Sequence, residues 1–284
     1  MPSKHIAIGF VLPLLISLCG VTGPLAQAAG VPELSPAQAR TLVDHALASE
    51  LKIAQKTGHP MRYLHRKATP NLTTTKKIVE TGDGDVARLI SVNGQPLNNE
   101  QEQKELARLD ALLDNPAQQE HRKHSEDSDT ARVLRILRAL PRAFVYQYVG
   151  PGTSAVGPVE QFTFTPDRNF SPSNMEEQVL TVMTGRLWID PNTERVVLLE
   201  GRLKHDVNYG MGIIGRLNKG GWVSIEQAPV SGDQWRIVHL QLAMTGRILF
   251  FSKSYDVVQE QSDFRPVPVG MSYRAAIAML RKDP

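Results

Sequence analysis

The sequence predicts an α+β fold in which helices cover one face of a large antiparallel sheet. Two observations support this prediction. Across residues 178–258, runs of β-branched and aromatic residues alternate with turn signals every ten or so residues, which is typical of consecutive antiparallel strands. Two stretches nearer the N-terminus, 35–57 and 98–140, have apolar residues at helical spacing instead.

The first predicted helix spans residues 35–57 and has a clear start signal. Ser35 is placed to cap it, Pro36 occupies the first helical position, and Gln38 completes a capping box. Gly58 follows as a stop signal. One apolar stripe runs along this helix: Ala39, Leu42, Val43, Ala46, Leu47, Leu51 and Ala54.

Three strands are expected next, at 61–68, 73–81 and 85–92, with a hairpin turn at Gly82-Asp83-Gly84 between the last two. Residues 98–140 then predict a helical insertion that ends at Pro141. We expect the insertion to break at HRKHSEDSD, residues 121–129. Its His and Asp residues suggest a metal site, but a solvated connection between helices explains the mixed charges better.

The rest of the chain predicts strands almost throughout. Their expected ranges are 143–149, 159–165, 178–189, 194–205, 213–217, 221–227, 234–244 and 247–258. An irregular excursion at 166–177 interrupts them, and Thr245-Gly246 is expected to link the last two strands.

Alternation along these strands predicts one apolar and one polar face, as in an antiparallel sheet covered on one side only. Seven of the apolar positions are assigned to the buried face, which either packs against the protein's own helices or lines a ligand cavity. They are Met183, Leu187, Val197, Leu199, Leu203, Leu240 and Leu242.

The N-terminus has the pattern of a signal peptide over residues 1–28. Lys4 and His5 precede an apolar run, and Ala26-Gln27-Ala28 is a cleavage signature, so we expect cleavage after Ala28 and a soluble, exported protein. The alternative is lipid attachment at Cys19, although Leu18 is a poor residue to precede a lipidated cysteine. Since Cys19 is the one cysteine, cleavage after Ala28 excludes disulfides and thiolate metal sites.

Charge and motifs exclude several functional classes. The net charge of +3 is a small excess, and basic residues do not interleave with aromatic ones as in nucleic-acid-binding proteins. Residues 210–215 match GxGxxG, but Asn218-Lys219-Gly220-Gly221 breaks the helix that a phosphate loop needs. No catalytic, cofactor-binding or metal-ligating residue is predicted.

The segments GRLWIDPNTERVVLLEGRL, VNYGMGIIGRLNKGG, QWRIVHLQLAMTGRILFF and VNGQPLNNEQEQKELARL together resemble an exported bacterial family. That family is related to the LolA/LolB-like periplasmic lipoprotein carriers. The resemblance spans nearly the whole chain after the signal peptide. It implies a single half-barrel domain over 29–284, in which a strongly curved antiparallel sheet has helices on or beside its concave face. The charged insertion at about 98–140 is longer than a minimal carrier needs.

The resemblance also implies a function, which is non-enzymatic binding or carrying of lipid or lipoprotein acyl chains in the bacterial cell envelope, with peripheral contact with the membrane. Two alternatives stay open. The first is a structural or interaction protein whose own helices fill the concave face. The second is an envelope hydrolase. The sequence leaves the ligand and the oligomeric state open.

Overall fold

The computed structural model describes residues 33–55, 58–210, 215–232, 234–248 and 251–282. The signal peptide, its cleavage site at Ala28 and Cys19 lie outside these residues. Within Glu33–Pro284, five helices accompany thirteen strands: α1 (Pro36–Ala54), β1 (Met61–Thr69), β2 (Leu72–Val79), β3 (Val86–Val92), β4 (Gln95–Pro96), α2 (Asn99–Asp114), α3 (Pro116–Ala143), β5 (Phe144–Ser154), β6 (Gly157–Pro166), α4 (Met175–Leu180), β7 (Met183–Asp190), β8 (Arg195–Leu203), β9 (Val207–Tyr209), β10 (Gly215–Leu217), β11 (Trp222–Ser231), β12 (Gln234–Ile248), β13 (Phe251–Pro266) and α5 (Tyr273–Lys282). No described helix has the length and apolar character needed to cross a membrane.

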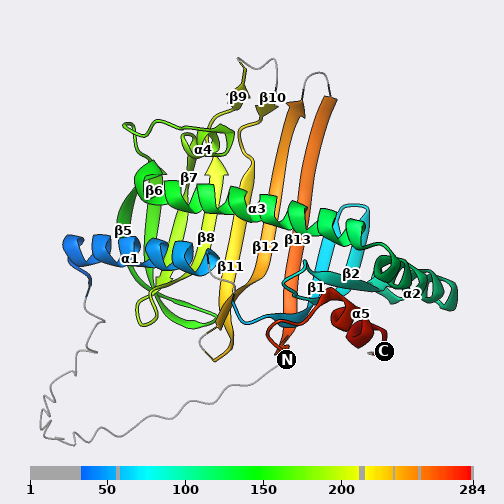
Figure 1. Ribbon diagram of the computed structural model, residues 1–284. Coiled ribbons are helices and arrows are strands. Elements are labelled where there is room, and N and C mark those ends of the chain that lie inside the picture. The colour runs from blue at the N-terminus through cyan, green and yellow to red at the C-terminus, as the bar shows by residue number, and fades with distance from the viewer. Residues whose placement is uncertain (1–32, 56–57, 211–214, 233, 249–250, 283–284) are drawn as a thin grey trace, which may run out of the picture. The chain divides into compact units, whose positions relative to one another are not determined.

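The strands form one curved antiparallel sheet, which confirms the predicted α+β fold class (Figure 1). Their order is β4-β3-β2-β1-β13-β12-β11-β8-β7-β6-β5, and outside this path β10 pairs with β12 while β9 pairs with β10. Most neighbours along this path are also neighbours in sequence, as expected for hairpin-connected antiparallel strands. β1 and β13 are the paired strands that lie farthest apart in the sequence, and their pairing joins the N-terminal strands to the C-terminal strands.

Helices α1, α3 and α4 pack on the sheet at its β5–β8 end. α1 begins as the sequence predicts, since the Ser35 side chain accepts a hydrogen bond from the Gln38 backbone and Gln38 returns one to Ser35. The buried stripe of α1, including Val43 and Leu47, meets the end of α3 and the strands beneath. The buried residues of this main core are Ala39, Leu42, Val43, Ala46, Leu47, Ala139, Leu140, Ala143, Phe144, Phe162, Phe164, Leu180, Met183, Leu187, Ile189, Val196 and Leu203.

Helices α2 and α5 make a second, smaller core at the β1–β3 end of the sheet. Val79 and Val86 contact Leu109 and Leu112 of α2, and Ile277 and Leu280 of α5 complete the cluster. The sequence analysis did not predict α5, although its apolar residues have helical spacing.

Four predicted boundaries were wrong. The helical insertion breaks at Asn115, which caps α3 through its side chain, with Pro116 in the first turn of that helix. The 121–129 segment lies inside α3, which also continues past Pro141. Residues 175–180, partly assigned to strand, form α4, and Thr245-Gly246 lies within β12 because that strand continues to Ile248.

Candidate functional site

One face of the sheet can be followed from the main core to the opposite end of the fold. Directly opposed residues of an antiparallel pair project from the same face, so the strand pairs identify which side chains share it. These pairs connect, strand by strand, Leu187, Leu199, Ile225, Leu240, Gln259 and Lys67. We call this the inner face. It is apolar from β7 to β12 and polar from Gln259 onward.

Four of the candidate cavity residues lie under the helices. Met183, Leu187 and Leu203 are buried in the main core, and Leu199 packs against that core while remaining partly exposed. The helices therefore fill this part of the inner face.

Leu240 and Leu242 lie beyond the main core on β12. Both are half-buried and are directly opposite Ile225 and Val223 of β11. On the other side of β12, Leu242 is opposite Val257, which is also half-buried. Apart from Val223, which packs against the main core, these residues form an apolar stretch of the inner face outside that core.

The placement of Val197 corrects the alternation argument. The pairing of β7 with β8 shifts register between Trp188 and Ile189, so that Ile189 is opposite Val196 rather than Val197. This β-bulge turns Val197 away from the inner face. Val197 is buried instead in a separate cluster with Val159 and Trp235.

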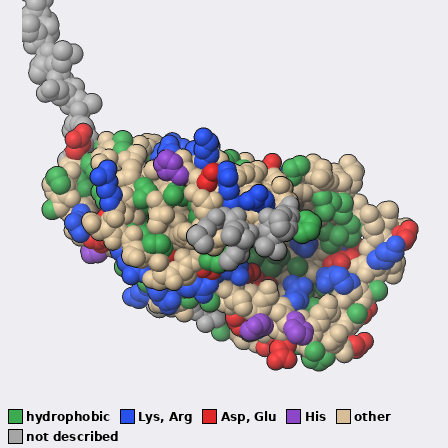
Figure 2. All heavy atoms as spheres, turned by 90° about the horizontal axis from the view of Figure 1, so that it is seen from above, with side chains coloured by type: hydrophobic (Ala, Val, Ile, Leu, Met, Phe, Trp, Pro, Cys, Tyr) green, Lys and Arg blue, Asp and Glu red, His purple; other side chains and the backbone are tan. Residues whose placement is uncertain are grey.

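A pocket of about 310 Å³, the rim pocket, lies where β9, β10, β12 and β13 end beside α4. It continues the inner face, since Met244 is opposite Tyr255 and Gly246 is opposite both Lys253 and Leu217. Figure 2 shows hydrophobic side chains beside a hollow in the surface at this end of the molecule. The pocket is lined by Met175, Tyr209, Gly215, Arg216, Leu217, Gly246, Arg247, Ile248, Lys253 and Tyr255.

Large hydrophobic side chains at the rim are unusually exposed. The exposed fractions are 71% for Phe251, 55% for Met175, 53% for Ile248 and 50% for Tyr255. Singly exposed apolar residues are ordinary, but a group around one apolar pocket marks a binding surface. This site was not predicted from the sequence, because the expected strand ended at residue 244, whereas β12 continues to Ile248.

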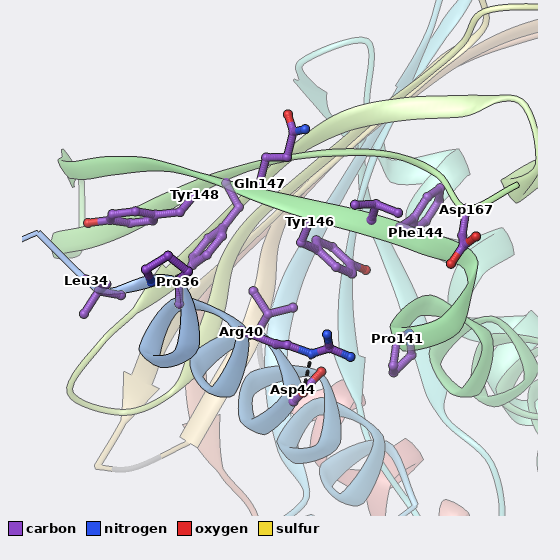
Figure 3. A pocket seen from close by; sticks show the side chains of 14 residues that line it. Leu34, Pro36, Arg40, Asp44, Pro141, Phe144, Tyr146, Gln147, Tyr148 and Asp167 are labelled. Atoms are coloured by element: carbon purple, nitrogen blue, oxygen red, sulfur yellow. Dashed lines mark ion pairs between the residues drawn. The ribbon is translucent and has the colours of Figure 1, made fainter. Parts of the chain in front are cut away.

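A second pocket, of about 630 Å³, opens between the start of α1 and strand β5 (Figure 3). Its lining is half polar. In its wall, the Arg40 Nε atom lies 3.9 Å from an Asp44 carboxylate oxygen. The Tyr146 hydroxyl donates a hydrogen bond to the Leu140 carbonyl at 3.1 Å. Burial raises the pKa of Tyr146, so its hydroxyl stays protonated. This edge pocket contains none of the seven candidate cavity residues.

An acidic cluster joins α3 to the β2–β3 turn. Glu126 accepts from the Asp85 backbone N–H at 3.1 Å, and Gln119 donates to the Gly84 carbonyl at 2.8 Å. Burial, assisted by the charges of Glu126 and Glu80, raises the pKa of Asp85 to about 7. Perturbed acids often mark catalytic sites, but neither the rim pocket nor the edge pocket is lined by these carboxyl groups.

The other candidate motifs carry no site in the part of the chain that the structure describes. No group of three or more His, Cys, Asp or Glu side chains there could hold a metal ion. Gly210 follows β9 and Gly215 begins β10, while residues 211–214 of the GxGxxG match lie outside the described residues.

No family model matches the chain, and no curated protein matches it either. Among solved structures, the chain is similar to a domain from Vibrio parahaemolyticus described as an outer membrane lipoprotein-sorting protein domain. The two share 11% identity over 84% of this chain and 97% of that chain, with a TM-score of 0.33. A DUF1329 family protein from Desulfovibrio piger ATCC 29098 matches at 11% identity over 82% of this chain and 94% of that chain, with a TM-score of 0.26.

Proposed function

We propose that this protein binds an apolar ligand on its inner face, without catalysis, in the bacterial cell envelope. The ligand class is lipid, either free or as the acyl part of a lipoprotein. One observation carries the proposal, which is the apolar stretch of Leu240, Leu242 and Val257 that lies outside the main core and leads toward the rim pocket.

The chemistry of this surface suits an acyl chain. The rim pocket is walled by aliphatic and aromatic groups, including Leu217, Ile248 and Tyr255. Each buried methylene contributes about 0.8 kcal/mol, so ten methylenes contribute about 8 kcal/mol before the loss of chain entropy. Such a ligand needs no specific polar contact to bind.

The rim also suits contact with a membrane surface, through which a lipid would enter. Phe251, Ile248 and Met175 are exposed there, and Arg216, Arg247 and Lys253 lie among them. Apolar and aromatic residues that enter a bilayer interface are favoured when nearby cations meet anionic headgroups.

The alternative of a structural or interaction protein whose helices fill its own concave face, here called the filled-face alternative, is supported by a specific observation. Met183, Leu187 and Leu203 are covered by α1, α3 and α4, as in a protein whose helices occupy its own concave face. The two functions make different predictions for the uncovered residues. In a carrier, Leu242 contacts ligand, whereas in a structural protein its exposure has no consequence for binding.

Displacement of a fluorescent fatty acid from the purified protein tests the proposal, with mass spectrometry of its organic extract to identify lipid that co-purifies. We expect saturable binding by the wild type and a loss of at least about tenfold in Leu242→Glu, because an ionised carboxylate beside an acyl chain is unfavourable. Val149→Glu is the matched control, since Val149 is 60% exposed on β5, at the edge of the sheet. Absence of binding by the wild type, or equal loss in both variants, would contradict the proposal.

A further inference from the structure

The polar end of the inner face carries a group of basic side chains. His65 of β1 is directly opposite Lys76 of β2, and Lys67 lies two residues along β1 on the same face. We call these three residues the cationic patch. They are accessible, since His65 and Lys76 are partly exposed and Lys67 is exposed.

Apart from each other, the patch residues have only uncharged side chains, and no carboxylate, directly opposite them on the neighbouring strands, with Leu89 opposite Lys76. Lys67 lies between Gln259 on one side and Thr74 on the other, and His65 lies opposite Gln261. The His65 ring is hydrogen-bonded to the Gln259 side chain at 3.1 Å. Lys76 makes no ion pair with any of the residues that the structure describes.

The helices near the patch add further positive charge. Burial is the largest cause of the lowered pKa of Lys76, and the charges of Arg108 on α2 and Arg122 on α3 lower it further. Burial also lowers the pKa of His65, and Lys76 and Lys67 lower it further. The one carboxylate acting on Lys76, Glu105, already binds Arg108 at 2.7 Å and 2.8 Å.

Two further acids on this side of the fold, Glu80 and Glu126, have other partners, and the raised pKa of a third, Asp85, favours its uncharged form. Glu80 accepts from the Met61 backbone N–H at 2.9 Å and lies 3.6 Å from Arg236. Glu126 accepts from the Asp85 backbone. Positive charge is therefore concentrated on a half-buried surface with too few anions to neutralise it, and a bound anion would relieve this repulsion.

We propose that the cationic patch binds the anionic headgroup of the ligand, through a phosphate group, while the ligand's acyl chain lies along Leu240, Leu242 and Val257. This inference rests on the proposed function and specifies its ligand as an anionic amphiphile. Three strand spacings separate β12 from β2, which is about 14 Å. A single amphiphile is long enough to reach both surfaces.

The test compares three amphiphiles with the same acyl chain and different headgroups, namely lysophosphatidylglycerol, lysophosphatidylcholine and a monoacylglycerol. Each displaces the fluorescent fatty acid from the full protein. We expect the wild type to prefer lysophosphatidylglycerol over the monoacylglycerol by about tenfold, as expected for two partly exposed charged contacts. In Lys67→Gln/Lys76→Gln that preference should disappear, while monoacylglycerol binding stays unchanged.

The matched control is Lys52→Gln/Lys104→Gln, which removes the same charge from exposed positions on α1 and α2. Equal affinity of the wild type for all three amphiphiles, or a preference that survives in Lys67→Gln/Lys76→Gln, would overturn the inference. Loss of the preference in the control would show that only net charge matters and would overturn it equally.

A second measurement separates this inference from the proposed function. Glycerol 3-phosphate is titrated into the protein while the ring resonances of His65 are followed by NMR. Saturable shifts that the Lys67→Gln/Lys76→Gln variant lacks would support the anion site even if no acyl compound bound, and would indicate a soluble phosphate as its source. No shift at millimolar phosphate and no headgroup preference would together refute the site, even if the monoacylglycerol bound normally.

Discussion

The Glu50 carboxylate of α1 accepts hydrogen bonds from the Arg195 guanidinium of β8, at 2.8 Å from Nε and 3.2 Å from Nη2. The same carboxylate accepts from the Val196 backbone N–H at 3.1 Å. The Arg195 guanidinium also lies 5.4 Å from the centre of the Trp235 ring. Both charged side chains are buried, so this pair fixes the end of α1 on the sheet beside the β-bulge that reorients Val197.

Glu50→Ala should destabilise the protein by about 3–5 kcal/mol, because it leaves the buried Arg195 charge without its partner. Urea unfolding followed by circular dichroism would measure the change. Asp44→Ala is the matched control on the same helix, since its partner Arg40 is 87% exposed and exposed pairs contribute about 0–1 kcal/mol. Equal losses in the two variants would show that the buried pair has no special role.

The raised pKa of Asp85 predicts that the stability of the protein depends on pH. Because the folded-state pKa of about 7 exceeds the ordinary value of 3.8, the stabilising contribution of this group is complete below about pH 4 and is lost as the pH rises through 7. The free energy of unfolding should therefore decline across this range by at most about 1.4 kcal/mol per pH unit from this one carboxyl group.

Asp85→Asn should flatten that decline, and the difference from the wild type should grow from pH 5 to pH 8. Urea unfolding at several pH values would show it. Asp129→Asn is a suitable control, because Asp129 is exposed on α3 and its ion pair is with Arg132 of the same helix. An identical pH profile for wild type and Asp85→Asn would mean that Asp85 ionises normally in the folded protein.

Local signals in the sequence were sufficient for the elements but not for the long-range arrangement. The Ser35–Gln38 capping box, the β1–β3 strands and the alternation of β7 depend on neighbouring residues, and all of them were predicted. The register shift opposite Trp188 was not, because a bulge depends on how two strands pair rather than on either strand alone.

The candidate site shows the same limit. Alternation identified Leu199, Leu240 and Leu242 as inner-face residues, and the strand pairs agree. Whether helices cover them depends on where α1 and α3 pack, which periodicity does not encode. The cationic patch was missed for a related reason, since Lys67 and Lys76 become neighbours only when β1 pairs with β2.

Covered and uncovered residues of the inner face should respond differently to truncation. Leu187→Ala should destabilise the protein by about 2–5 kcal/mol, because Leu187 is fully buried in the main core. Leu242→Ala should cost less, since Leu242 is only partly buried. Parallel urea unfolding of the two variants measures both. A core-like loss for Leu242→Ala, together with no fatty-acid binding by the wild type, would favour the filled-face alternative.

Exchange of ligand with membranes should depend on the rim. Phe251→Glu replaces the most exposed aromatic side chain at the rim with a charge, which is unfavourable within an apolar bilayer interface and is repelled by anionic headgroups. We expect transfer of a fluorescent fatty acid from protein to phosphatidylglycerol vesicles to slow by about tenfold, which corresponds to roughly 1.4 kcal/mol. Binding of the same fatty acid in vesicle-free buffer should stay nearly unchanged, because Phe251 does not line the rim pocket.

Val149→Glu introduces the same charge at an exposed position of β5 and should leave transfer unchanged. If both variants transferred ligand at the wild-type rate, the rim would not be the route by which ligand reaches the membrane.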